Sequence, residues 1–146
     1  MPGITVGVDG SGHSQRALEW ALKEAAVRHT PLTVLAVHEA VRGYFGGATV
    51  YSGDPDLTEK ARAAAQEETD KVLATLGENR PESVTVLAAH GFPVEELINA
   101  SRQADLVVLG SRGAGGFSRL TMGSVAMQVA EHAACPVTIV RPPHRD

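Results

Sequence analysis

The chain has 146 residues, of which 43% are hydrophobic and 21% are charged. This length fits one domain with a real core, and the composition is that of a globular protein rather than a disordered one. Thirteen basic against seventeen acidic side chains give a formal net charge of −4, which argues against nonspecific binding to nucleic acid or to an anionic membrane.

The cellular compartment is indicated by what the sequence lacks. The lone cysteine, Cys135, cannot form a disulfide within the chain, so a reducing compartment is expected. The first ten residues have neither the basic nor the long apolar region of a signal peptide. No apolar run approaches the ~18 residues of a membrane span. We therefore expect a cytoplasmic protein with one domain over residues 1–146.

The hydrophobic pattern predicts strands that alternate with helices. Apolar, largely β-branched runs of strand length occur at Ile4–Val8, Leu32–Val37, Val84–Ala88, Leu106–Leu109 and Pro136–Val140. Apolar residues recur with helical spacing over His13–Arg28, Leu57–Leu76, Val94–Gln103 and Ser124–Ala134. Ser11 or Ser14 is expected to cap the first helix, and Thr58 with Glu59 to begin the second. The glycine-rich stretch Arg42–Asp56 is predicted to be a surface loop with at most a short turn.

This order predicts an α/β fold with a doubly wound, five-stranded parallel sheet and helices on both faces. Ligands of such sheets bind beyond the carboxyl ends of the strands, where the strand order reverses. Two strand ends carry ligand-type residues, Asp9–Gly12 after the first strand and Gly110–Gly123 after the fourth. If these two strands are neighbours, both loops open into one crevice.

The second of these loops has the residues of a phosphate site. Gly110, Gly113 and Gly123 leave the backbone without Cβ atoms, so that its N–H groups can approach an anion closely. Ser124 follows at the expected start of a helix, where the positive end of the helix dipole favours negative charge. Each residue also has a simpler interpretation, Gly110 as a strand end and Ser124 as a helix cap.

Other chemistries find no support in the sequence. A Gly-Lys dipeptide, required by a Walker A loop, is absent. Asp9-Gly10-Ser11-Gly12 begins like a dinucleotide fingerprint, but Gln15 stands where the third glycine belongs. The six histidines show no zinc spacing, and no nucleophile with its base is evident, so we assign no catalytic or metal-ligating residue. His38 and His90 end two strands and are weaker candidates for the wall of the crevice.

The spacing Gly110-x2-Gly113-x9-Gly123-Ser124 resembles the ATP-binding pattern of the universal stress protein family. The resemblance covers essentially the whole chain. It includes the first strand with Asp9, ALEWAL at Ala17–Leu22, AVHE at the end of the second strand, GFPVEEL at Gly91–Leu97 and the closing CPVTIV. It implies a Rossmann-like sheet of the adenine nucleotide alpha hydrolase-like type, with strand order 3-2-1-4-5. It also implies a homodimer paired through the fifth strand, Pro136–Val140.

The resemblance implies roles for residues at the two strand ends. Asp9, with Gly10 beside it, would accept hydrogen bonds from the ribose or adenine side of the ligand. Val37 would present its backbone to the adenine edge.

The phosphates would lie at the second loop. Gly110 and Gly113 would let the backbone approach, and Gly123, Ser124 and Val125 would donate N–H groups, as Ser124 would its hydroxyl. Arg112 would add a charge-assisted contact, although Arg112 and Arg119 can equally be solvated loop charges. A divalent cation, Mg²⁺, would accompany the ATP.

The expected function is therefore a nucleotide-binding regulatory module in stress adaptation. The loop contains no evident general base, so binding is favoured over turnover of ATP. Two alternatives stay open, a slow ATPase or autophosphorylating enzyme, and a dimeric scaffold that binds no nucleotide. The intact glycine spacing weighs against the scaffold.

Overall fold

Five parallel strands form the centre of the computed structural model, which describes residues 2–39, 41–45, 48–52, 55–112 and 123–143. The strands of the sheet are β1 (Ile4–Val8), β2 (Leu32–Glu39), β5 (Val84–Gly91), β6 (Leu106–Gly110) and β7 (Val137–Val140). They are hydrogen-bonded in the order β5-β2-β1-β6-β7, and every pair is parallel. The predicted sheet and its strand order are confirmed.

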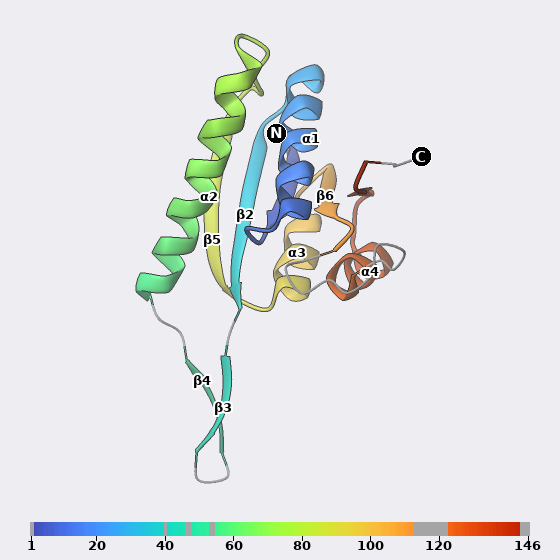
Figure 1. The fold of residues 1–146 in the computed structure, drawn as a ribbon. Coiled ribbons are helices and arrows are strands. Elements are labelled where there is room, and N and C mark those ends of the chain that lie inside the picture. Colours follow the sequence, from blue (N-terminus) through green and yellow to red (C-terminus); the bar gives the residue numbers. More distant parts are fainter. Residues whose placement is uncertain (1, 40, 46–47, 53–54, 113–122, 144–146) are drawn as a thin grey trace.

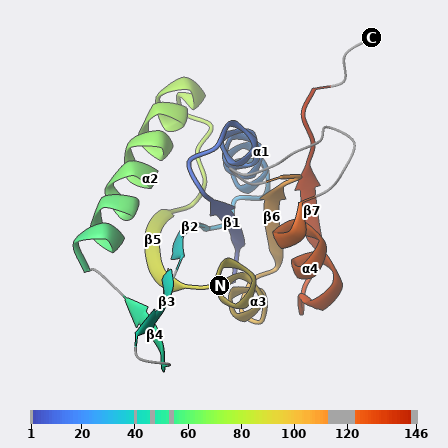
Figure 2. The same ribbon diagram turned by 60° about the horizontal axis from the view of Figure 1, so that its bottom comes forward.

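In the described residues, four helices cover the sheet, two on each face. They are α1 (Gly12–Arg28), α2 (Pro55–Leu76), α3 (Pro93–Ser101) and α4 (Ser124–His132). Figure 2 shows α1 and α2 on one side of the strands and α3 and α4 on the other. Because successive strand residues point to opposite faces, β6 contributes Val108 to the core under α1 and α2, and Val107 to the core under α3 and α4.

Helix α1 illustrates how local sequence sets an element. Its apolar positions, including Leu18 and Leu22, are fully buried against the central strands. Ser11 is the N-cap, since its side chain accepts a hydrogen bond from the Ser14 N–H at 3.2 Å. The helix ends at His29, whose φ of 53° is left-handed and whose N–H reaches back to the last turn.

The region predicted as a loop contains a hairpin, and that prediction is wrong for most of it. Strands β3 (Val41–Phe45) and β4 (Ala48–Ser52) pair antiparallel and form a two-stranded sheet of their own. In Figure 1 this hairpin projects past the end of the main sheet. The sequence signal is two runs of β-forming residues around a Gly-Gly dipeptide, which is a known hairpin pattern.

Smaller differences concern the ends of elements. Strands β2 and β5 run past the predicted Val37 and Ala88, and α4 stops at His132 rather than Ala134. Helix α2 begins at Pro55, before the predicted start, because proline suits the first helical turn, where its missing N–H costs nothing. Among the described residues, no helix is long and apolar enough to span a bilayer.

The burial pattern predicts how two leucines on helices differ in their effect on stability. Leu18→Ala removes a side chain with 0% exposure and should lower the free energy of unfolding by about 2–5 kcal/mol. Leu57→Ala, at 42% exposure on α2, is the control and should cost about 1 kcal/mol or less. Urea denaturation measures both, and similar losses for the two variants would contradict this assignment of the core.

Candidate functional site

The two predicted ligand loops meet at one edge of the sheet. Strands β1 and β6 are hydrogen-bonded neighbours, with Ile4 opposite Leu106 and Val6 opposite Val108. Because the pairing is parallel, the segment after Val8 and the segment after Gly110 leave the sheet at the same edge. The strand order reverses here, since β2 lies on one side of β1 and β6 on the other. This is where doubly wound folds bind their ligands.

The turn from β1 into α1 is held by a network of short-range hydrogen bonds. The Asp9 carboxylate Oδ1 accepts from the Ser11 N–H at 2.9 Å. The hydroxyl of Ser14, a buried residue, accepts from the Asp9 N–H at 3.2 Å and donates to the Ser11 carbonyl at 3.1 Å. Gly10 adopts a φ of +83°, a conformation that favours glycine, and nothing lies within 4 Å of its side-chain position. The network fixes Asp9 at the rim while leaving space above Gly10.

Gly110 is explained by packing against α1. A Cβ at this position would lie 2.7 Å from the His13 carbonyl oxygen and 2.9 Å from its carbon. Only glycine therefore lets the first turn of α1 approach the end of β6 so closely. The approach of a ligand to Gly110 stays a prediction, because the contact with His13 already accounts for the residue.

The end of β6 is tied by the backbone to the start of α4. The Ser111 N–H donates to the Val140 carbonyl at 3.1 Å, and the Ser111 carbonyl accepts from the Gly123 N–H at 2.7 Å. The Gly123 N–H therefore has a partner within the protein, and its donation to a phosphate stays a prediction. The first intrahelical bond of α4 runs from the Met127 N–H to the Gly123 carbonyl at 3.0 Å.

Helix α4 consequently starts with N–H donors that have no partner within the described part of the chain. The N–H groups of Ser124, Val125 and Ala126 precede that first bond, and no side chain of the N-cap covers them. The Ser124 hydroxyl is exposed and accepts a 2.8 Å hydrogen bond from the Gln128 side chain. Three N–H groups at the positive end of a helix can hold an anion.

Arg112 lies beside this helix end and is buried. It directly follows Ser111, and only 8% of its surface is exposed. Within the described residues its Nε has no hydrogen-bond partner, and the residue forms no ion pair. The interpretation of Arg112 as a solvated loop charge is wrong. A guanidinium stays protonated, and a buried charge is costly unless it is paired, so this position favours an anion.

A second arginine, Arg16, is half-buried and has no counterpart among the predicted site residues. Arg16 on α1 donates from Nη2 to His13 Nδ1 at 2.8 Å, and its Nε is buried without a partner among the described residues. Its sequence position, among the polar residues of an amphipathic helix, gives no sign of burial, because that depends on the close contact of α1 with β6.

The remaining predicted residues are placed as follows. Val37 is half-buried near the end of β2, and Gly113 and Arg119 lie outside the described residues. His38 and His90 are opposite each other in the pairing of β2 with β5, on the far side of β1 from Arg112. The described residues contain no group of three His, Cys, Asp or Glu that could hold a metal ion. Burial raises the pKa of the Cys135 thiol, so a reactive thiolate is disfavoured there.

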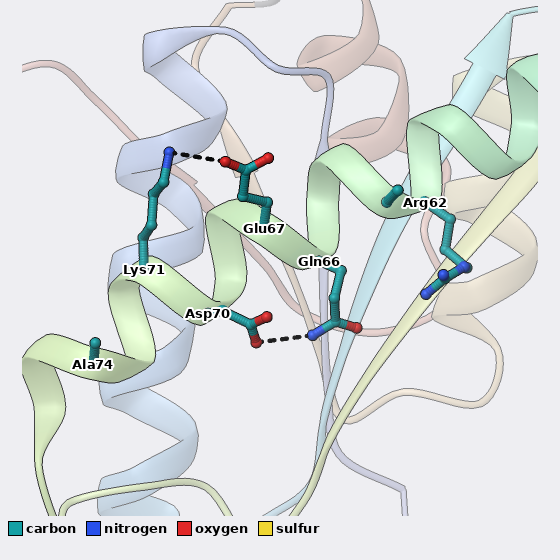
Figure 3. Close-up of a pocket in the computed structure, with 7 residues that line it drawn as sticks. Arg62, Gln66, Glu67, Asp70, Lys71 and Ala74 are labelled. Atoms are coloured by element: carbon teal, nitrogen blue, oxygen red, sulfur yellow. Dashed lines mark hydrogen bonds and ion pairs between the residues drawn. The ribbon is translucent and has the colours of Figure 1, made fainter.

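A separate hollow of about 510 Å³ lies along α2 and does not belong to this edge of the sheet. Its lining, shown in Figure 3, comes from one helix and consists of Arg62, Ala63, Gln66, Glu67, Asp70, Lys71 and Ala74. Gln66 bonds Asp70 at 3.0 Å and Lys71 pairs with Glu67 at 3.4 Å. These pairs follow the ordinary i, i+4 spacing of a solvated helix face. On the same face, a hydrogen bond from Arg62 lowers the pKa of Glu59.

Two glycine substitutions test the packing at the site. Gly110→Ala should lower the free energy of unfolding by about 1–3 kcal/mol, because the new Cβ overlaps the His13 backbone. Gly12→Ala is the matched control, since nothing lies within 4 Å of its Cβ, and it should be neutral or stabilising by about 0.4–1 kcal/mol. Urea denaturation measures the free energy of unfolding of both variants. An equal change in the two variants would contradict the packing explanation for Gly110.

Comparison with known proteins agrees with this geometry. The family model "Universal stress protein family" matches residues 2–141. Universal stress protein Rv1996 of Mycobacterium tuberculosis is 35% identical over 161 residues, covering 97% of this chain but 51% of the relative. The chain thus spans about half the length of that relative.

Two solved structures share the fold. Universal stress protein UspA from Lactobacillus plantarum aligns with a TM-score of 0.72 and 25% identity, covering 96% of this chain and 97% of the other. The universal stress protein from Archaeoglobus fulgidus in complex with dAMP aligns with a TM-score of 0.60 and 26% identity, covering 97% and 98%. The sheet, the glycine-bearing loop and these matches together show that the chain belongs to the universal stress protein family.

Proposed function

We propose that this protein binds ATP, accompanied by Mg²⁺, and acts as a nucleotide-dependent regulatory module in stress adaptation. The observation that carries the proposal is the N-terminus of α4 next to the buried Arg112, neither of which has an acidic partner among the described residues. Both features are positive, and both are satisfied by a phosphate chain. A relative of the same family was solved in complex with dAMP, which supports an adenine nucleotide as the ligand class.

The proposed ligand lies across the edge formed by β2, β1 and β6. Asp9 and Gly10 would face the ribose, and the Val37 backbone would face the adenine. Ser124 and Val125 would donate N–H groups to the phosphates, and the open N–H of Ala126 would join them.

The residues next to the proposed phosphate position are also part of the proposal. Arg112 would contact the phosphates, Gly110 and Gly113 would permit the close approach, and Gly123 would serve as the N-cap.

Binding without efficient hydrolysis is proposed because the segment around the phosphates lacks a base. Residues 110–126 contain no Asp, Glu, His, Lys, Tyr or Cys that could activate a water molecule. A regulatory role then requires only that ATP binds one conformation better than another. The lone Cys135 supports the cytoplasm as the proposed location.

The ribose contact can be tested with two aspartates at opposite ends of the sheet. Asp9→Ala should weaken ATP binding at least about tenfold, because a charged acceptor at the rim is lost. Asp105→Ala is the control, since Asp105 is exposed just before β6 begins. Isothermal titration calorimetry with Mg²⁺ measures both. A wild-type chain that ignores adenine nucleotides at millimolar concentration would refute the proposed function.

Turnover is tested by phosphate release. The wild-type protein with ATP and Mg²⁺ should release inorganic phosphate at the background rate of the buffer. Release well above background that falls in Ser124→Ala would instead establish the slow ATPase.

We further propose a homodimer paired through Pro136–Val140. Strand β7 is at the edge of the sheet and its four residues are half-buried. The carbonyls of Pro136 and Val140 accept from β6 and the residue after it, so the alternate residues Val137 and Ile139 present their backbone groups to the free edge. A second copy of the same strand can pair there.

A proline at the free edge tests the dimer. Val137→Pro removes an outward N–H and should convert the wild-type dimer into a monomer in sedimentation velocity experiments. Val137→Ala, which shortens the side chain but keeps the N–H, should remain dimeric. A monomeric wild-type protein would disprove this mode of assembly.

A further inference from the structure

We propose that Arg112 makes this site selective for nucleotides with an extended phosphate chain, ATP and ADP, over monophosphates and cyclic monophosphates. The inference rests on the proposed function and names the ligand class of the same site. It starts from a residue with an unusual environment. Arg112 is more than nine-tenths buried, and its Nε lacks any partner among the described residues.

Arg16 shares the unpartnered Nε among the described residues, but three other arginines have ordinary partners. Arg28 pairs with Glu24 at 2.9 Å, and Arg62 with Glu59 at 2.7 Å, in both cases within one exposed helix face. Arg80 donates to the Gly77 carbonyl at 3.0 Å. Arg112 is largely buried and has gained no carboxylate or carbonyl partner in the described part of the chain. None of the described residues pairs with this charge, and an anionic ligand would neutralise it.

The position of Arg112 indicates which anion. The hydrogen bond from the Gly123 N–H to the Ser111 carbonyl, 2.7 Å long, fixes the backbone next to Arg112 against the N-cap of α4. Ser111 itself is 2% exposed, and its Oγ is also without a partner in the described residues. The backbone of Arg112, a positively charged residue, thus lies next to the N–H groups of the first helical turn of α4.

One phosphate can be held by the helix N-terminus alone, as in many proteins. A second phosphate on the ligand would increase the affinity only if a second cationic group of the protein can bind it. A guanidinium is suited to this, because it can donate two parallel hydrogen bonds to phosphate oxygens. The difference between binding ATP and binding AMP therefore measures what Arg112 contributes.

The experiment is a titration series by calorimetry at constant Mg²⁺ and ionic strength. The ligands are ATP, ADP, AMP and cyclic AMP, and the proteins are wild type, Arg112→Gln and Arg112→Lys. The control is Arg102→Gln, at an exposed position after α3. We expect wild type and the control to bind ATP at least about tenfold more tightly than AMP. Arg112→Gln should reduce that ratio to about threefold or less while changing AMP affinity little, and Arg112→Lys should lie between.

The stability of the ligand-free protein gives a second readout. Removing an uncompensated buried charge should leave the urea midpoint of Arg112→Gln unchanged or raise it. If Arg112 serves only to hold the fold, the midpoint falls and all four ligands weaken by the same factor, which overturns the inference.

The outcomes separate the two proposals. Wild type that binds all four nucleotides equally disproves the selectivity but leaves nucleotide binding intact. A ratio of ATP affinity to AMP affinity that is unchanged in Arg112→Gln also disproves the role of Arg112 in selectivity and leaves nucleotide binding intact. Wild type that binds none of them removes the proposed function itself.

Discussion

The contact between the first turn of α1 and Gly110 of β6 is the constraint on which this edge of the molecule depends. A Cβ on Gly110 would come within 2.7 Å of the His13 oxygen, so no side chain fits and helix and strand meet backbone to backbone. This contact sets the spacing between the Asp9 turn and the end of β6. The Ser14 hydroxyl then fixes the turn from within, because it bonds both Asp9 and Ser11. Hydrogen bonds hold Asp9 in place at this edge of the sheet, whereas the space next to Gly10 is empty of described atoms.

A second constraint acts across the sheet, where two backbone hydrogen bonds join Ser111 to Val140 and to Gly123. They align the next residue, Arg112, with the start of α4. A helix dipole is a modest attraction for anions at an exposed site, worth about 0.3–1 kcal/mol. A largely buried guanidinium is a stronger one, because the low dielectric around it screens its charge less than water does. In the proposed function, both attractions act on the phosphates of the same nucleotide.

The strands, the helices and their order can be predicted from the sequence, because these features depend on local residue patterns. The β-branched runs specify the strands of the main sheet, and the polar turn after Val8 specifies the helix cap. Properties that depend on distant residues cannot be predicted. Gly110 has the sequence context of a ligand position, whereas its neighbour is His13, nearly a hundred positions away in the sequence. Arg112 resembles any loop arginine until its burial is known, and the bond that occupies the Gly123 N–H spans the whole connection from β6 to α4.

The β3–β4 hairpin escapes prediction for a different reason, since its glycines favour a loop interpretation over the alternating residues on either side. In the described residues, β3 and β4 are hydrogen-bonded to each other and to none of the five strands in the main sheet. Such an appendage can lengthen, shorten or change its residues without disturbing the register of the core. Evolution can therefore change the length and sequence of the segment between β2 and α2 while the main sheet is kept.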